Sequence, residues 1–204
     1  MIRLTLQSDD LRDIPENADG GHFKLFLPDA GQTKADFKAQ LEKGPRPTTR
    51  TYTVRYARPN LGEIDVDFVA HGDEGPASAW AEAATDQSFC GFAGPGQPKL
   101  TEFRSDWYLI AADMSALPVA SAGLEAMPMD AKGVAVFEIT SPEDRQDIAA
   151  PPGIEQHWLI QSDPLEPSTA QCDLLRDMPW ADGRVQTLIA GETGAVRDLR
   201  MLAR

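Results

Sequence analysis

The chain has little cysteine, no long apolar run and far fewer basic than acidic side chains. Its two cysteines, Cys90 and Cys172, are far apart and fit neither a zinc-ligand spacing nor a disulfide framework, so they suit a reducing cytoplasm. No segment approaches the length of a membrane span. The start of the chain carries acidic residues and has no continuous apolar stretch, which excludes an obvious signal peptide. The expected location is therefore the cytoplasm, without insertion into a membrane.

The shortage of basic residues leaves a strongly acidic chain. Its 19 Lys and Arg are set against 32 Asp and Glu, which gives a formal net charge of -13. Such a surface repels nucleic acid and anionic lipid, so neither is an expected partner, and solubility or adaptation to salt explains the charge best. With 42% hydrophobic residues among 204, the chain can bury one large core or two small ones, and we expect a monomer.

The first half of the chain reads as short strands separated by turn residues. Alternating apolar side chains predict strands over 1–7, 22–28, 50–58 and 63–70, with segments rich in Pro, Gly and Asn between them. Several short strands at this spacing predict an antiparallel β-barrel over residues 1–98. The one helix expected in this half covers 77–85.

After about residue 98 the pattern changes to strands that alternate with helices. Strands are expected over 107–112, 133–139, 155–161 and 185–191, and helices over 117–127, 169–177 and 194–204, with a short helix or turn over 143–149. Alternation of this kind predicts a parallel sheet with right-handed crossovers. The sequence therefore predicts a second domain, of the α/β class, over residues 99–204.

The run Arg50-Thr51-Tyr52-Thr53-Val54-Arg55 has the residue types with which a strand holds a flavin dinucleotide. Arg50 is the expected pyrophosphate ligand through its planar guanidinium, Tyr52 and Thr53 are the expected contacts of the flavin ring, and Arg55 is a further contact to phosphate or ribose. Because alternate side chains of a strand share a face, Tyr52 and Thr53 reach one ring only with help from twist or a bulge. Taken alone, the run also fits an ordinary barrel strand.

A second run, HGDEGPASAWA at 71–81, predicts a tight turn that opens into a helix. The N–H groups of Ala77 and Ser78 at the start of that helix suit a pyrophosphate, and Ser78 Oγ can add a hydrogen bond. Proline beside serine is also simply good helix-start chemistry. His71 also fits a structural role, and Trp80 fits core packing better than cofactor contact. The candidate cofactor contacts in this run are His71, Gly75, Pro76, Ala77, Ser78 and Trp80.

With these motifs the chain resembles the siderophore-interacting proteins, the flavin-dependent ferric-siderophore reductases. The resemblance rests on RTYTVR, on EIDVDFVAHGDEGPASAWA and on the loop Gly94-Pro95-Gly96, and further on HFKLFLP near residue 22, ADMSALP at 112–118 and Ala190-Gly191-Glu192. It implies an FAD-binding β-barrel joined to a parallel-sheet domain for NADH or NADPH, the plan of the ferredoxin-NADP reductases. It also implies reduction of siderophore-bound iron(III), with the electrons passing through FAD.

The resemblance extends to residues of the second domain and to the chelate. Asp113 and Ser115 are implied contacts of the nicotinamide dinucleotide. In this chain Ala112, Met114 and Ser115 stand where the family usually has Gly, Glu and Thr. The resemblance implies neither a catalytic side chain nor a protein-bound metal, because iron enters as part of the substrate. Basic side chains are implied to guide the anionic chelate, and the candidates are Lys43, Arg46 and Arg104.

Two other interpretations stay open. One is a non-catalytic flavin- or siderophore-binding protein that has lost the use of nicotinamide. The other is a reductase fed by a different donor such as ferredoxin, although the net negative charge disfavours an acidic ferredoxin. Family members usually continue beyond the last expected helix, so we expect a C-terminal tail either to be lost or to lie beyond Arg204.

Overall fold

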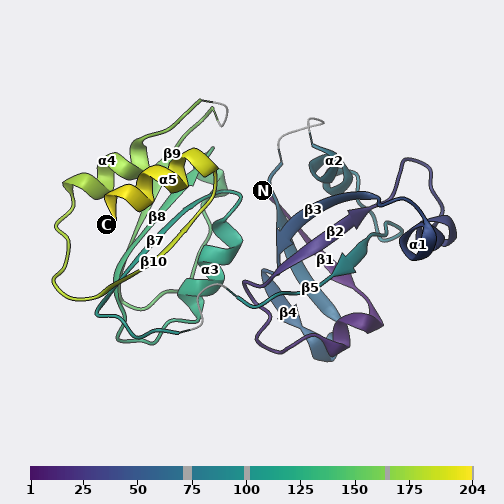
Figure 1. Ribbon diagram of the computed structural model, residues 1–204, viewed down its shortest axis with the longest axis horizontal. Helices are drawn as coiled ribbons and strands as arrows, with labels where there is room; N and C mark the ends of the chain where they lie inside the picture. Colours follow the sequence, from purple (N-terminus) through teal and green to yellow (C-terminus); the bar gives the residue numbers. More distant parts are fainter. Residues whose placement is uncertain (71–74, 99–101, 164–165, 204) are drawn as a thin grey trace. The chain divides into compact units, whose positions relative to one another are not determined.

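Two units, Met1–Pro98 and Lys99–Arg204, make up the chain (Figure 1). The structure, a computed structural model, describes residues 1–70, 75–98, 102–163 and 166–203. Within these ranges no helix is both long enough and apolar enough to cross a membrane.

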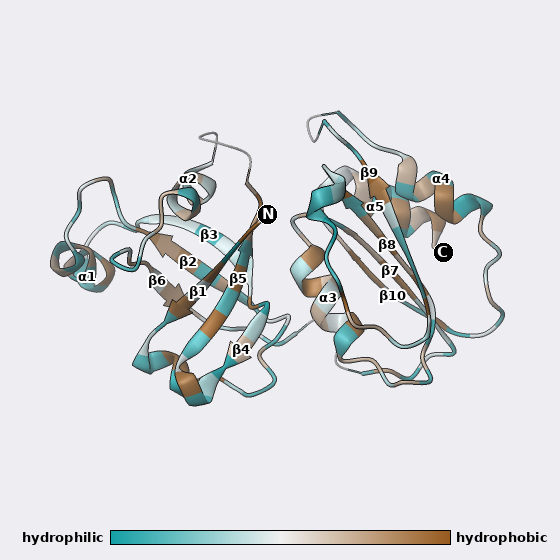
Figure 2. Cartoon of the chain, turned by 180° about the vertical axis from the view of Figure 1, so that it is seen from behind, coloured by the Kyte–Doolittle hydropathy of each residue, from teal (hydrophilic) through white to brown (hydrophobic). Residues whose placement is uncertain are grey.

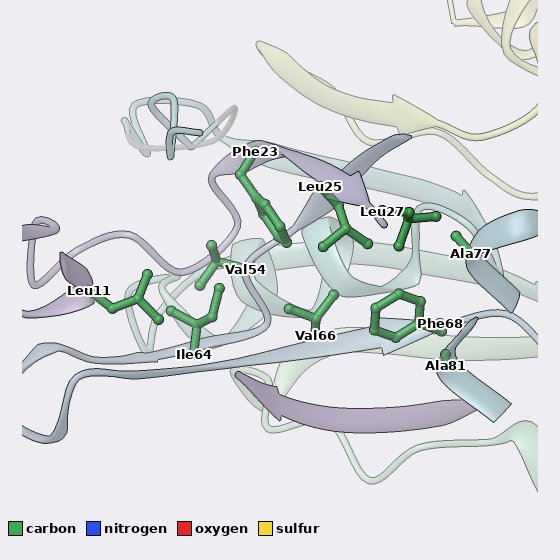
Figure 3. Close-up of a cluster of buried hydrophobic side chains, with 10 residues drawn as sticks. All are labelled: Leu11, Phe23, Leu25, Leu27, Val54, Ile64, Val66, Phe68, Ala77 and Ala81. Carbon is green, nitrogen blue, oxygen red and sulfur yellow. The ribbon is translucent and has the colours of Figure 1, made fainter. Parts of the chain in front are cut away.

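The first unit is built from antiparallel strands in two three-stranded sheets, with the orders β1-β5-β4 and β3-β2-β6. Apolar side chains of β2 and β5 point toward one another between the sheets, and Ala77 and Ala81 of α2 join this cluster beside Phe68 (Figure 3). The antiparallel β architecture predicted for this half is confirmed. Its elements are β1 (Ile2–Gln7), β2 (His22–Leu27), α1 (Lys34–Lys43), β3 (Thr48–Thr53), β4 (Tyr56–Arg58), β5 (Glu63–Phe68), α2 (Pro76–Glu82) and β6 (Gly91–Ala93), with short 3₁₀ helices at Asp9–Asp13 and Pro59–Leu61.

The second unit is a four-stranded parallel sheet covered by helices, which confirms the predicted α/β class. Helix α3 lies on one face of the sheet, and α4 and α5 lie on the other (Figure 1). Strands β7 and β8 are mostly hydrophobic (Figure 2), as expected of strands covered on both faces. The elements are β7 (Trp107–Asp113), α3 (Leu117–Glu125), β8 (Lys132–Ile139), β9 (Gly153–Ile160), α4 (Ala170–Asp177), β10 (Val185–Ala190) and α5 (Thr193–Leu202), with a 3₁₀ turn at Pro142–Asp144.

The strand order β10-β7-β8-β9 creates a switch point between β7 and β10. Strands β7, β8 and β9 follow one another across the sheet in chain order, and β10 then pairs with β7 on the side opposite β8. The carboxyl ends of β7 and β10 are adjacent, with Ala112 in register with Ala190. In open parallel sheets, ligands bind outside the carboxyl ends of the strands at such a point.

The prediction of one continuous strand over 50–58 is wrong. Strand β3 pairs with β2 in one sheet, whereas β4 pairs with β5 in the other. Between them the Val54 N–H donates to the Gly21 carbonyl and the Arg55 N–H donates to the Asp65 carbonyl, both at 2.8 Å. The chain therefore crosses from one sheet to the other within two residues, a change that side-chain alternation does not register.

The prediction that this half holds a single helix is also wrong, because α1 is a second one. Helix α1 buries only Phe37, so it lacks the apolar stripe by which an amphipathic helix is found in a sequence. Its start is fixed by a cap in which Thr33 Oγ1 accepts the Asp36 N–H at 3.2 Å and donates to the Asp36 carboxylate at 2.6 Å. The short strand β6 was not predicted, and the helix or turn expected over 143–149 is a 3₁₀ turn that ends at Asp144.

Candidate functional site

Edge strand β3 carries Arg50 and Tyr52 on the face that looks into the core. Cross-strand partners share a face, and these two residues are in register with Leu25 and Phe23 of β2, both of which are buried. Arg50 is nevertheless exposed. Its guanidinium Nη1 donates to the carbonyl oxygen of the neighbouring Thr49 at 3.0 Å. A cation therefore stands at the rim of the core, where an anionic ligand can reach it.

Tyr52 connects the two sequence motifs through aromatic contacts. Its ring centroid is 4.5 Å from that of Phe68 at the end of β5, and the Phe68 centroid is 5.9 Å from that of Trp80 in α2. Phe68 is fully buried, whereas Tyr52 and Trp80 are half-buried. Burial raises the pKa of the Tyr52 phenol, and the charge of Arg50 opposes that shift. Strand β3 and helix α2 thus pack against the same side chain.

Thr51 and Thr53 lie on the opposite, outer face of β3. Lys24 Nζ donates to Thr51 Oγ1 at 2.5 Å, and Thr53 is in register with His22. The register between β2 and β3 is unbroken over the whole of β3, so no bulge turns Thr53 toward the face of Tyr52. The structure does not bring Tyr52 and Thr53 to one face of the strand.

Arg55 lies inside the first unit. The residue is 1% exposed, and its guanidinium carbon is 4.1 Å from the centroid of the Tyr56 ring. A side chain in this position reaches a surface phosphate only by leaving its packing. The contacts of Arg55 therefore support a cation–π role in the fold instead of a contact to phosphate or ribose.

Helix α2 begins with Gly75 as its N-cap and Pro76 as its first residue. Ala77 and Ser78 in the first turn are both buried, and Ser78 Oγ donates to Glu82 Oε1 at 3.1 Å. The hydroxyl of Ser78 is thus used within the helix. What the start of α2 can present to a pyrophosphate is its backbone, because first-turn N–H groups lack acceptors within a helix.

The chemistry of these groups fits a flavin dinucleotide. Arg50 is a cation suited to the pyrophosphate, Tyr52 is a half-buried aromatic ring suited to stacking, and the start of α2 supplies backbone donors. Phe68 fixes Tyr52 and α2 on one support. His71, the remaining candidate of the second motif, lies outside the described residues.

In the second unit Asp113 ends β7 and holds the turn that leads into α3. Its Oδ1 accepts the Ser115 N–H at 2.8 Å, the Ser115 hydroxyl at 2.6 Å and the Ala116 N–H at 3.1 Å. Its Oδ2 accepts the N–H of Glu192, just after β10, at 2.7 Å. The structure therefore brings Asp113 and Ser115 together at the carboxyl edge of the sheet, beside the switch point.

Two residues that depart from the family pattern are buried. Ala112 is 1% exposed, and its carbonyl accepts the Gln171 side-chain amide at 2.9 Å. Met114 is 8% exposed, and its sulfur accepts the Thr140 N–H at 3.4 Å. Both side chains thus pack inside the protein and leave the surface of the carboxyl edge to other residues.

The cations suggested for the chelate are all exposed. Lys43 ends α1 and Arg46 follows it, so both precede β3, the strand that carries Arg50. Arg104 belongs to the second unit and lies 3.6 Å from the carboxylate of Glu102.

Comparison with known proteins assigns both units. Residues 1–99 match the siderophore-interacting FAD-binding domain, and residues 105–204 match the siderophore-interacting protein model. The chain belongs to the siderophore-interacting protein family. The first unit of this siderophore-interacting protein is the FAD-binding domain of the family, which confirms both the resemblance and the predicted cofactor.

Individual relatives agree with this assignment. Ferric vibriobactin reductase ViuB of Vibrio cholerae is 34% identical over 213 residues, which cover 100% of this chain and 78% of that protein. The siderophore-interacting protein SipS from Aeromonas hydrophila has a TM-score of 0.82 at 34% identity, covering 98% of this chain and 77% of that one. The ferredoxin reductase in carbazole 1,9a-dioxygenase has a TM-score of 0.66 at 16% identity, covering 98% of this chain and 57% of that one. The last match confirms the predicted ferredoxin reductase-like fold.

Proposed function

We propose that this siderophore-interacting protein is an FAD-dependent oxidoreductase that reduces iron(III) held by a siderophore, with NADH or NADPH as the electron donor. The observation that carries the proposal is the contact of Tyr52 and Trp80 with Phe68, which joins the two flavin motifs in a unit that matches the FAD-binding domain. Siderophore oxygen donors bind the hard iron(III) ion strongly and iron(II) far more weakly, so reduction releases the metal.

The residues divide the work of holding the cofactor. Bound FAD supplies the conversion between a two-electron donor and a one-electron acceptor. Arg50 holds the pyrophosphate by charge-assisted hydrogen bonds, and the Tyr52 ring, supported by Phe68, offers an aromatic face. In the first turn of α2, the N–H groups of Ala77 and Ser78 contribute backbone donors, and Pro76, which has no N–H, begins the helix. The ring contact predicted for Thr53 is not part of this arrangement, because its side chain lies on the face of β3 opposite Tyr52.

The setting we propose is a monomer in a reducing cytoplasm. Cys90 and Cys172 are both free thiols, which supports a reducing compartment. Lys43, Arg46 and Arg104 remain the proposed cations for an anionic ferric chelate. Their exposure makes them accessible to such a substrate.

An anaerobic titration tests the function. FAD-loaded protein is mixed with NADH or NADPH while the visible absorbance of oxidised flavin is followed, and a ferric siderophore is then added with a chromogenic iron(II) chelator. We expect at least one nucleotide to bleach the flavin, and the flavin absorbance to return as the iron(II) colour develops. Protein stripped of FAD is the control and should produce no colour above the rate without protein.

The competing interpretations give different results in the same cuvette. A flavin that stays oxidised with both nucleotides but is bleached by reduced ferredoxin assigns a different donor. A flavin that no donor reduces, in a protein that still binds the ferric siderophore, identifies a binding protein. A pure protein that takes up no FAD refutes the proposal as a whole.

A further inference from the structure

Two aspartates, one at each end of β7, join this strand to β10 in the same way. At the carboxyl end, Asp113 Oδ2 accepts the N–H of Glu192 at 2.7 Å. At the amino end, Asp106 Oδ2 accepts the N–H of Arg184 at 2.8 Å. Glu192 and Arg184 flank the two ends of β10, so each carboxylate clamps the two strands outside their own hydrogen-bond ladder.

Each aspartate also lies against a glycine that has a positive φ angle. The φ angle is +136° at Gly191 and +109° at Gly183, a region that residues with a Cβ rarely adopt. A Cβ on Gly191 would collide with Asp113 Oδ2, and one on Gly183 would lie 2.9 Å from Asp106 Oδ2. The two clamps therefore share one design, a carboxylate packed on a glycine loop.

The clamps differ in what else the carboxylate holds and in where it lies. Asp113 also fixes the start of α3, because its Oδ1 accepts the N–H groups of Ser115 and Ala116. Asp106 is exposed, and its second partner is the Arg184 guanidinium at 3.6 Å. Asp113 alone of the two lies at the carboxyl edge, beside the switch point where open parallel sheets bind ligands.

We propose that Asp113 is a positioning residue of the nicotinamide dinucleotide site. It fixes the β7–α3 turn and the β10–α5 loop relative to one another, so that the surface on which the dinucleotide docks is preformed. Both of its oxygens accept hydrogen bonds from the chain itself, and it therefore acts through the two loops instead of touching the dinucleotide. The inference rests on the proposed function, which supplies the dinucleotide as the ligand of this edge.

The matched variants Asp113→Asn and Asp106→Asn test the inference. Each change replaces one carboxylate oxygen by an amide donor, so a backbone N–H loses its acceptor or faces another N–H. The FAD-loaded proteins are titrated with NAD⁺ and with NADP⁺ by calorimetry, and their thermal midpoints and FAD contents are measured. We expect D113N to raise the dissociation constant of the bound dinucleotide about tenfold, the order of one lost charge-assisted hydrogen bond. D106N should leave that constant unchanged. It should lower the thermal midpoint by about as much as D113N does.

The outcomes separate the inference from the function on which it rests. Wild-type protein that binds neither dinucleotide refutes the nicotinamide donor, and the inference falls with it. Wild-type binding that D113N leaves intact, or that both variants weaken equally, overturns the inference alone. Should D113N fail to fold, Gly191→Ala and Gly183→Ala form a second matched pair that disturbs the same two clamps. Gly191→Ala should weaken dinucleotide binding and Gly183→Ala should not, and equal effects would again overturn the inference.

Discussion

Replacing Arg50 with alanine separates flavin binding from folding. The side chain is exposed and hydrogen-bonds the neighbouring Thr49 carbonyl, so its loss should change the free energy of unfolding by no more than about 0.5 kcal/mol. Against a pyrophosphate, the same guanidinium makes charge-assisted hydrogen bonds that contribute about 1.5–3 kcal/mol. Since about 1.4 kcal/mol corresponds to a factor of ten, the dissociation constant for FAD should rise roughly 10- to 150-fold.

The assay is a titration of the apoprotein with FAD, followed through flavin fluorescence, beside a urea unfolding curve of each apoprotein. Arg46→Ala is the matched control, because Arg46 is another exposed arginine next to β3 and donates to Thr49 Oγ1 at 3.3 Å. R46A should bind FAD like the wild type. An R50A protein with wild-type affinity for FAD would remove Arg50 from the cofactor site. Weaker FAD binding together with a loss of more than about 1 kcal/mol of stability would show that Arg50 acts through the fold.

Three further predictions concern the fold and its titratable groups. Phe68→Ala should lower the free energy of unfolding, measured in urea, by about 3–5 kcal/mol, because the ring is fully buried; a loss below about 1 kcal/mol would contradict its central place in the core. Hydrogen bonds from Arg58 hold the pKa of the Asp65 carboxyl below its ordinary value. The pair therefore stabilises the fold fully at a pH above the ordinary pKa, and this stabilisation is lost as the pH falls through the lowered pKa. Stability of Asp65→Asn should therefore depend less on pH than wild-type stability between about pH 5 and pH 1, and parallel profiles would refute the pairing. Burial raises the pKa of Cys90 to about 11 and also raises that of the less buried Cys172, so a disulfide reagent near pH 8 should label Cys172 first; mass spectrometry would show the reverse order if this is wrong.

Side-chain periodicity located the elements that have an apolar face in the core. In β5, Asp65 and Asp67 are also buried, where Arg58 and Arg3 pair with them, but the alternation of the fully buried Ile64, Val66 and Phe68 still marks the strand. Helix α1 was missed for the converse reason, since it buries Phe37 alone and depends on its Thr33 cap. The break between β3 and β4 was missed because the change of sheet depends on pairing partners, and pairing leaves no mark on the alternation of one strand.

In the candidate site, too, residue types could be read from the sequence, whereas contacts that form only on folding could not. Residue types placed a cation at Arg50 and an aromatic ring at Tyr52, and both are accessible in the structure. The part played by Phe68 was not predicted, because its contacts with β3 and α2 arise only when the two sheets pack. The residue types of the run predict Arg55 as a contact to phosphate or ribose, yet the crossing between the sheets buries it. Alternation predicts a continuous strand through Arg55, whereas the structure places this residue between β3 and β4, and the burial of its side chain follows from the fold.

Packing against the core is sufficient to explain why α2 has small side chains. Ala77 and Ala81 are buried in the cluster that contains Phe68 (Figure 3), and the Ser78 hydroxyl is donated to Glu82. A larger residue at either alanine would push the helix away from β5, since interiors are close-packed. Backbone donors at the start of α2 can serve a pyrophosphate only while the helix is held in this position. The alanines that serve the core therefore also set the position of the N–H groups, and a run of small residues can mark a cofactor site although its side chains face inward.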